Sequence, residues 1–274
     1  MKRAFSEIVN GNIWLSILAV VASFVVGGVL IAASSEAVQT AATYLAARPS
    51  DFFMALWNSV FGAYDAMFRG AVFNYQANDF NQMIRPITET LAYATPIVMS
   101  GLGLAVAFKS GLFNIGAAGQ IVFGAMFAGW VAIFVDLPGY IHFPIALLAG
   151  IIGGAFWGAL AGFLKAATGA NEVIVTIMFN YIAILLLGYL LKTPVLKAPG
   201  SVNPISPPVH DSAKYALLFG EQFRVHAGLI AMLIAVVFVW WLLNRSSIGF
   251  QFRALGHNPS AAKAAGINIG LTTV

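Results

Sequence analysis

The feature that most constrains this chain is a set of six apolar runs, each about 20 residues long. A helix of that length crosses the hydrocarbon core of a bilayer, where the backbone has only its own groups to hydrogen-bond. The sequence therefore predicts an all-α, polytopic transmembrane helical bundle of about six spans. We expect these spans at Ile13–Ala33, Ile87–Phe108, Ile115–Val135, Phe143–Leu164, Val173–Leu191 and His226–Leu243.

The composition supports a single transmembrane domain over residues 1–274. Only 9% of the residues are charged, against about 25% in ordinary soluble domains. The net charge of +4 is modest, so we expect lipid and not nucleic acid as the surrounding partner. There is no cysteine, and the four histidines are scattered, so we predict no metal site, no cofactor and no enzymatic activity.

Two long polar segments interrupt the runs. Between Ser34 and Pro86, aromatic residues recur at helical spacing over residues 52–68, which indicates an amphipathic helix. That helix could lie in the membrane interface or form a packed cap over the bundle. Lys192–Val225 contains five prolines, which favours an ordered extended loop.

The charge distribution leaves the orientation open. With the N-terminus inside, seven Lys and Arg residues fall on the inner side and seven on the outer side. The inner connections are shorter, and their higher basic density weakly favours a cytoplasmic N-terminus that includes Lys2 and Arg3.

Two polar clusters lie between or within spans. Glycines at 111, 116 and 119 are predicted to break or loosen the helix near Asn114 and Gln120, either as a lining of the translocation path or as a tight packed turn. Asn171 is predicted to cap the fifth span. Thr176 and Asn180 lie one turn apart on one face of that span, as pathway lining or as bonds between helices.

A third cluster follows the sixth span. Asn258 is a suitable N-cap, Pro259 a suitable first helical residue and Gly266 a suitable stop, so a short alanine-rich helix is predicted between them. A helix this short needs a surface to dock against. The alternative is an ordinary connecting loop with one helical turn.

Three blocks together resemble one family: residues 101–120, 171–181 and 253–267 are similar to successive segments of nucleoside-type ABC transporter permeases, within the branched-chain amino acid and ribose permease family. The resemblance runs from about Thr90 to the C-terminus. Two departures are clear. Ala118 stands where the family often has Glu, and the chain stops at Val274, where family members usually continue for several more spans, so we expect a C-terminally truncated piece.

The resemblance implies a bacterial inner-membrane (cytoplasmic-membrane) protein that pairs with a second permease subunit, cytosolic ABC ATPase subunits and an extracytoplasmic substrate-binding lipoprotein. It makes 253–267 the cytoplasmic coupling loop, with ATPase contacts expected from Arg253, Gly256, Asn258, Pro259, Ala262 and Gly266. Asn114, Gln120, Thr176 and Asn180 are the expected substrate-pathway residues.

The predicted function is import of nucleosides or a related small polar solute, driven by ATP hydrolysed in a partner, because no G-x-x-x-x-G-K-[ST] segment occurs here. Ribose-like sugars and branched-chain amino acids stay open as substrates. The alternative is a stand-alone secondary transporter or channel, which would need charged residues within the membrane.

Overall fold

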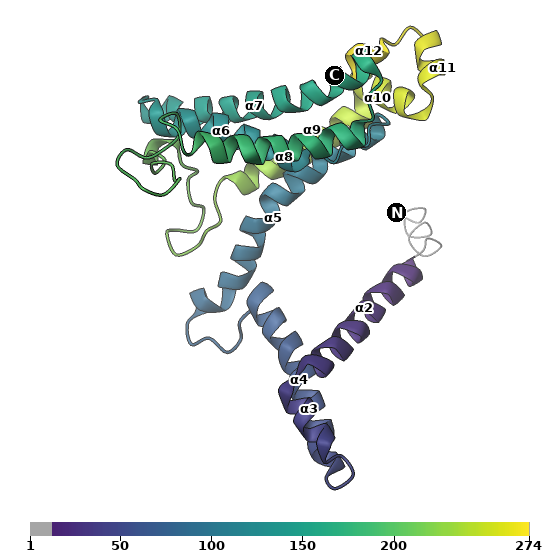
Figure 1. The fold of residues 1–274 in the computed structure, drawn as a ribbon, viewed down its shortest axis with the longest axis vertical. Helices are drawn as coiled ribbons and strands as arrows, with labels where there is room; N and C mark the ends of the chain where they lie inside the picture. The colour runs from purple at the N-terminus through teal and green to yellow at the C-terminus, as the bar shows by residue number, and fades with distance from the viewer. Residues whose placement is uncertain (1–12, 274) are drawn as a thin grey trace. The chain divides into compact units, whose positions relative to one another are not determined.

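The computed structural model describes residues 13–273 and confirms the helical class (Figure 1). The expectation for the N-terminal Lys2 and Arg3 lies outside the described residues. Within the described range there is no strand, and one isolated antiparallel bridge joins Leu217 to His226. The elements are α2 (Ile13–Ser34), α3 (Glu36–Thr43), α4 (Pro49–Ala71), α5 (Phe80–Lys109), α6 (Ala117–Phe134), α7 (Gly139–Thr168), α8 (Glu172–Leu190), η1 (Asp211–Ala213), α9 (Gly228–Arg245), α10 (Ser247–His257), α11 (Pro259–Ala264) and α12 (Ile269–Thr273).

Six helices in this range are long and apolar enough to cross a membrane: α2, α5, α6, α7, α8 and α9. They correspond one to one with the six predicted spans, and the chain is a multi-pass membrane protein. The largest difference is at α5, which begins at Phe80 and not at Ile87. Its first turns carry polar residues that hydropathy alone assigns to a loop.

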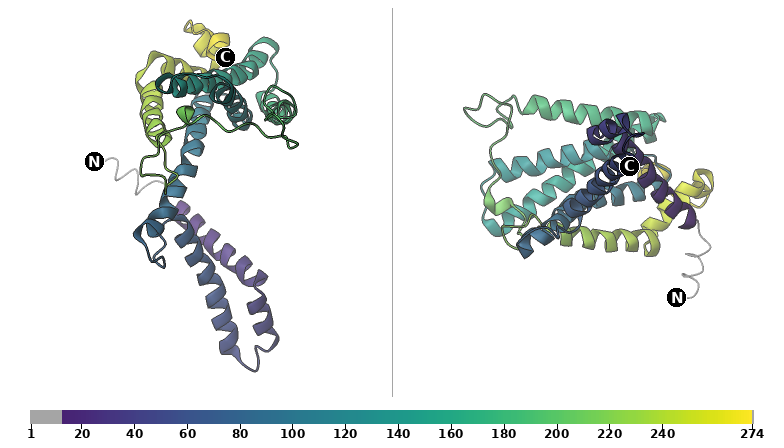
Figure 2. Two further views of the ribbon diagram at one scale, coloured as in Figure 1. Left: turned by 90° about the vertical axis from the view of Figure 1, so that its left-hand side faces the viewer. Right: turned by 90° about the horizontal axis from the view of Figure 1, so that it is seen from below.

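Contacts divide the chain into two compact units, one up to Thr90 and one from Leu91, and the division falls inside α5. In the first unit, α4 runs back along α2 and α3 (Figure 2). The predicted aromatic helix is confirmed, and it is longer than its aromatic stretch because Pro49 starts it, at a position where a missing N–H costs nothing. Its place in the membrane interface stays a prediction.

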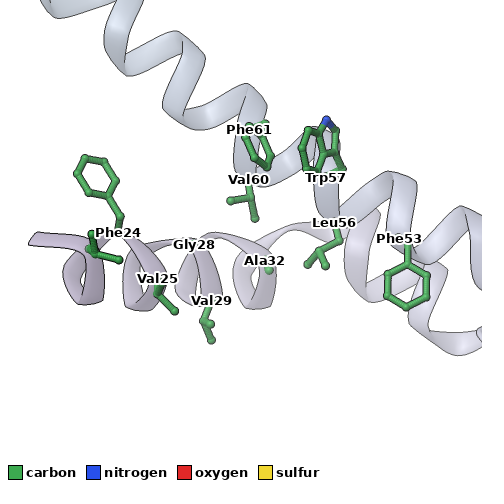
Figure 3. Close-up of a pocket in the computed structure, with 11 residues that line it drawn as sticks. Phe24, Val25, Gly28, Val29, Ala32, Phe53, Leu56, Trp57, Val60 and Phe61 are labelled. Atoms are coloured by element: carbon green, nitrogen blue, oxygen red, sulfur yellow. The ribbon is translucent and has the colours of Figure 1, made fainter. Parts of the chain in front are cut away.

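An apolar groove of about 770 Å³ lies between α2 and α4 (Figure 3). Small residues bring the two helices together here. A Cβ on Gly27 would lie 2.9 Å from the Tyr64 hydroxyl, which itself donates a hydrogen bond to the carbonyl of Phe24. The residues that line the groove are Val21, Phe24, Val25, Gly28, Val29, Ala32, Phe53, Leu56, Trp57, Val60 and Phe61.

The second unit has its core where α6, α7 and α8 lie side by side (Figure 1). Phe123 stacks on Trp157 with ring centroids 4.1 Å apart, and Phe179 of α8 packs against the indole with ring centroids 5.1 Å apart. Glycines allow α6 and α7 to approach closely, since a Cβ on Gly124 would lie 2.9 Å from the carbonyl of Gly150. This packing holds three of the spans together as one block.

The Lys192–Val225 segment contains no α-helix, as its prolines predict, and it is fastened to α7 by a histidine. His142 is fully buried. Its Nδ1 lies 2.7 Å from the Ser212 hydroxyl, and its Nε2 lies 3.2 Å from the carbonyl of Val131. Because a carbonyl only accepts, Nε2 carries the proton and Ser212 donates to Nδ1. The loop is therefore ordered by a contact made in the core.

Candidate functional site: the α5–α6 connector and the α10–α11 arm

The connector between α5 and α6, residues 110–116, begins with a Schellman turn. Gly111 has a φ of 77°, the N–H of Gly111 donates to Phe108 and the N–H of Leu112 donates to Ala107. Only glycine adopts this backbone conformation without strain. The prediction that Gly111 interrupts the helix is confirmed.

Asn114 shapes the second half of the connector. Its Oδ1 accepts a hydrogen bond from the N–H of Gly116 at 2.7 Å, and α6 starts at the next residue. Gly119, predicted to break or loosen the helix, is instead buried inside the first turn of α6. The N–H of Gly119 is hydrogen-bonded by a polar side chain of α8.

One face of α8 carries a stripe of polar side chains, at residues 172, 176 and 180. Thr176 Oγ1 accepts from the N–H of Ile115 at 3.2 Å. Asn180 Nδ2 donates to the carbonyl of Ile115 at 3.0 Å, and Asn180 Oδ1 accepts from the N–H of Gly119 at 2.7 Å. Both backbone groups of Ile115 are thus hydrogen-bonded by side chains of α8.

Glu172, the first residue of the stripe, joins the end of α7 to the start of α8. Glu172 lies 2.7 Å from the ammonium of Lys165 on α7, and its carboxylate also interacts with the backbone amide of Phe113. Both side chains of the ion pair are partly exposed, at 30% and 24%. The predicted cap is present as well, since Asn171 Oδ1 accepts from Val173 and Ile174.

Gln120 is directed toward α7. A Cβ on Gly158 would lie 2.5 Å from Gln120 Nε2, so the amide occupies the space that this glycine leaves. Thr176 is 4% exposed, whereas Asn114, Gln120 and Asn180 are half-buried. The four residues predicted for the pathway therefore gather around the connector at one end of α6, α7 and α8.

The α10–α11 arm, residues 246–266, follows α9. Ser246 caps α10 by accepting from the N–H of Gly249 at 2.9 Å. Helix α10 was not predicted, although Ser246, directly before its first residue, is a recognisable N-cap signal. A Cβ on Gly249 would lie 1.9 Å from the carbonyl of Leu242, so the turn from α9 into α10 depends on this glycine.

The short helix α11 is confirmed with both predicted caps. Asn258 Oδ1 accepts from the N–H groups of Ser260 and Ala261 at 3.0 and 3.1 Å. Gly266 has a φ of 84°, and the N–H of Ile267 donates to Ala262, which completes a second Schellman turn. A six-residue helix is held in place by its ends.

Among the residues predicted to contact the ATPase, Ala262 is only 3% exposed in this chain. Its contact with the ATPase stays a prediction. The exposed residues of the helix are Pro259, Ser260, Ala261, Lys263 and Ala264. The basic side chain and the small residues thus lie on the outward face.

The arm touches the connector at a contact between two glycines. A Cβ on Gly111 would lie 3.1 Å from the Cα of Gly256, and a Cβ on Gly256 would lie 2.3 Å from the carbonyl of Lys109. No side chain separates the two backbones. Arg253 lies one turn earlier, and its Nη1 is buried without a hydrogen-bond partner among the described residues.

Comparisons with known proteins agree with the blocks noted in the sequence. The family model described as the permease component of the branched-chain amino acid transport system matches residues 87–274. A guanosine ABC transporter permease protein of Bacillus subtilis is 37% identical over 79% of this chain and 57% of its own length. A nucleoside ABC transporter permease protein of Lactococcus lactis is 32% identical over 69% of this chain and 54% of its own.

A glucose ABC transporter permease protein of Haloferax volcanii is 35% identical over 66% of this chain and 50% of its own length. The chain spans about half the length of these curated relatives. No solved structure matches it. The family match covers more than half of the chain and includes the connector, the polar stripe of α8 and the arm, and the chain therefore belongs to the family of branched-chain amino acid transport permease components.

Proposed function

We propose that the chain is a membrane-spanning permease subunit of a bacterial ABC importer, which moves a small polar solute with ATP hydrolysed by a partner. The observation that carries the proposal is α11, a six-residue helix capped at both ends whose outward face combines Lys263 with small residues. Such a helix fits a groove with an acidic rim. Family membership supports the same role.

The proposed orientation puts the arm and the connector in the cytosol. Six spans from a cytoplasmic N-terminus return the chain to the cytosol after α9, and this bacterial protein would lie in the cytoplasmic (inner) membrane. Lys192–Val225 would then lie outside and contact a substrate-binding lipoprotein. The buried His142–Ser212 contact supports that role, because an ordered loop loses less entropy on docking.

The four polar residues around the connector are proposed to border the translocation path at its cytosolic end. Gln120 and Asn180 are half-buried and can reach a passing solute, whereas Thr176 is buried and fixes the connector. A second permease subunit would supply the facing wall. Nucleosides are the favoured substrates, since two of the relatives are described by guanosine and nucleoside transport, and sugars come next.

A stand-alone secondary transporter is less well supported. Within the six candidate spans, the carboxylates of the described residues are Glu89 and Glu172. Glu89 lies 4.0 Å from Arg85, and Glu172 lies 2.7 Å from Lys165. Glu172 is the first residue of α8, and both carboxylates are paired with a cation, which does not suit a carboxylate that must bind and release a coupling ion.

Uptake of radiolabelled guanosine by proteoliposomes that hold the complete transporter would test the proposal. Uptake should require ATP on the side of the membrane that carries the ATPase subunit. It should disappear when that subunit is omitted. Uptake that persists without ATP and follows an imposed proton or sodium gradient would contradict it and favour the secondary transporter.

A further inference from the structure

The contacts around the connector suggest a route by which movement of the arm reaches the spans. The route begins at the Gly111–Gly256 contact, where two backbones meet without intervening side chains. Side chains adjust by changing rotamer, whereas backbone atoms move only with their whole segment. A displacement of α10 is therefore passed to the connector with little loss.

The connector is held as firmly at its other end. Thr176 and Asn180 bind the N–H and the carbonyl of Ile115, and Asn180 also binds the N–H of Gly119. These side chains lie four residues apart on α8, so they form one ladder on one face. The connector cannot move away from α8 without breaking these hydrogen bonds.

The next step leads into the core. α8 packs against α6 and α7 through Phe179 and Trp157, and the Lys165–Glu172 pair ties the ends of α7 and α8. Helices α6, α7 and α8 thus move as one block. Packed cores respond in discrete steps and not by continuous deformation, which suits the transmission of a switch.

On the basis of the proposed function, we infer that Gly111, Gly256, Thr176 and Asn180 are positioning residues that transmit the ATPase-driven movement of the α10–α11 arm through the backbone of Ile115 to α8. Such coupling needs a physical element that both ends act on. The connector is that element. We therefore expect small changes at Thr176 or Asn180 to lower the yield of transport per ATP more than they lower assembly with the ATPase.

The test compares two substitutions of nearly equal size at one position. Thr176→Val keeps the shape and removes the acceptor for the N–H of Ile115, whereas Thr176→Ser keeps the acceptor. The readout is the number of solute molecules imported per ATP hydrolysed by the complete transporter in proteoliposomes. We expect about a fivefold fall for Thr176→Val, equivalent to one net hydrogen bond, and a near-normal ratio for Thr176→Ser.

A second pair addresses the other end of the route. Gly256→Ala places a methyl group against the carbonyl of Lys109, whereas Gly188→Ala adds one where nothing lies within 4 Å. Gly256→Ala should lower the same ratio and Gly188→Ala should not. Co-purification of the ATPase subunit with each variant separates transmission from assembly, and the isosteric Thr176→Val decides the question if Gly256→Ala fails to assemble.

Two outcomes keep this inference distinct from the proposed function. An unchanged ratio in Thr176→Val, in a transporter that still imports with ATP, overturns the transmission route and leaves the importer intact. Import by the unaltered protein without ATP overturns the proposed function itself. A fallen ratio with normal ATPase binding supports both.

Discussion

The two ends of the second unit are built in different ways. At the connector end, made by residues 109–119, 165–180 and 246–273, backbones meet at glycines and side chains bind backbone groups. At the loop end, made by 131–142 and 191–228, prolines stiffen the chain and one buried histidine fastens it. Gly249 and Gly256 at the connector end are required by space, whereas Gly220 at the loop end has nothing within 4 Å.

This difference suggests a division of work. Contacts made through backbone atoms pass movement from one element to the next, which suits the end proposed to meet an ATPase. A loop ordered by prolines keeps one shape while its exposed residues meet a partner, which suits the end proposed to meet a binding protein. Substitutions at the two ends should therefore differ in what they damage.

The largest effect is expected for Gly249→Ala at the connector end. Its methyl group would lie 1.9 Å from the carbonyl of Leu242, so the turn between α9 and α10 must shift. We expect a loss of about 3 kcal/mol, read as a lower melting temperature of the detergent-purified protein. The matched change at the loop end is Gly220→Ala, which meets only the strain of a φ of 84° and should cost about 1 kcal/mol. Equal losses would contradict the contrast.

The sequence predicted the helices but not this contrast. Hydropathy locates the spans because lipid imposes the same requirement on every one of them. The caps at Asn171, Asn258 and Gly266 were also predictable, since each depends on neighbours within four residues. Local rules sufficed for these elements.

Contacts between distant segments were beyond the sequence. Gly119 was expected to break or loosen the helix, and it lies within one because Asn180, 61 residues away, binds its N–H. Ala262, one of the residues expected to contact the ATPase, is only 3% exposed in this chain. The four-residue spacing of Glu172, Thr176 and Asn180 was a usable signal for the ladder, whereas nothing in one sequence pairs Gly111 with Gly256.

The next largest effect is expected for His142→Ala at the loop end. This change leaves the Ser212 hydroxyl and the Val131 carbonyl without their partner and opens a buried space. We expect a loss of about 2 kcal/mol and faster proteolysis within 192–225, with the connector end unaffected. His257→Ala, at an exposed position, is the control and should leave the proteolysis rate unchanged.

A smaller effect is expected for Asn258→Ala at the connector end. The substitution removes the acceptor for two N–H groups at the start of α11 and should cost about 1 kcal/mol, concentrated in the arm. Hydrogen exchange of residues 259–266 should quicken while exchange in α6 and α8 stays the same. Ser260→Ala removes no such acceptor and serves as the control. Uniform acceleration through the spans would show that α11 is not an independent local element.

The smallest effect concerns pH at the loop end. The ammonium of Lys214 lies 2.6 Å from Asp211 and lowers the pKa of that carboxyl below its ordinary value of 3.8. A depressed folded-state pKa stabilises the fold above the ordinary value, and the stabilisation disappears as the pH falls through the lowered one. Asp211→Asn should thus match the unaltered protein at strongly acidic pH and differ from it slightly near neutrality, by thermal melting. A difference that grew toward acid would contradict this sign.

The central claim is that the two ends lie on opposite sides of the membrane, with the arm facing the cytosol. Because the chain has no cysteine, single thiols can be placed at Val202, which is 95% exposed in the loop, and at Ala261, which is exposed on α11. An impermeant thiol reagent should label Val202→Cys in intact cells and Ala261→Cys only in inverted membrane vesicles. When the ATPase subunit is bound to those vesicles, labelling of Ala261→Cys should fall. Labelling of Ala261→Cys in intact cells, or of both positions from the same side, would contradict the account.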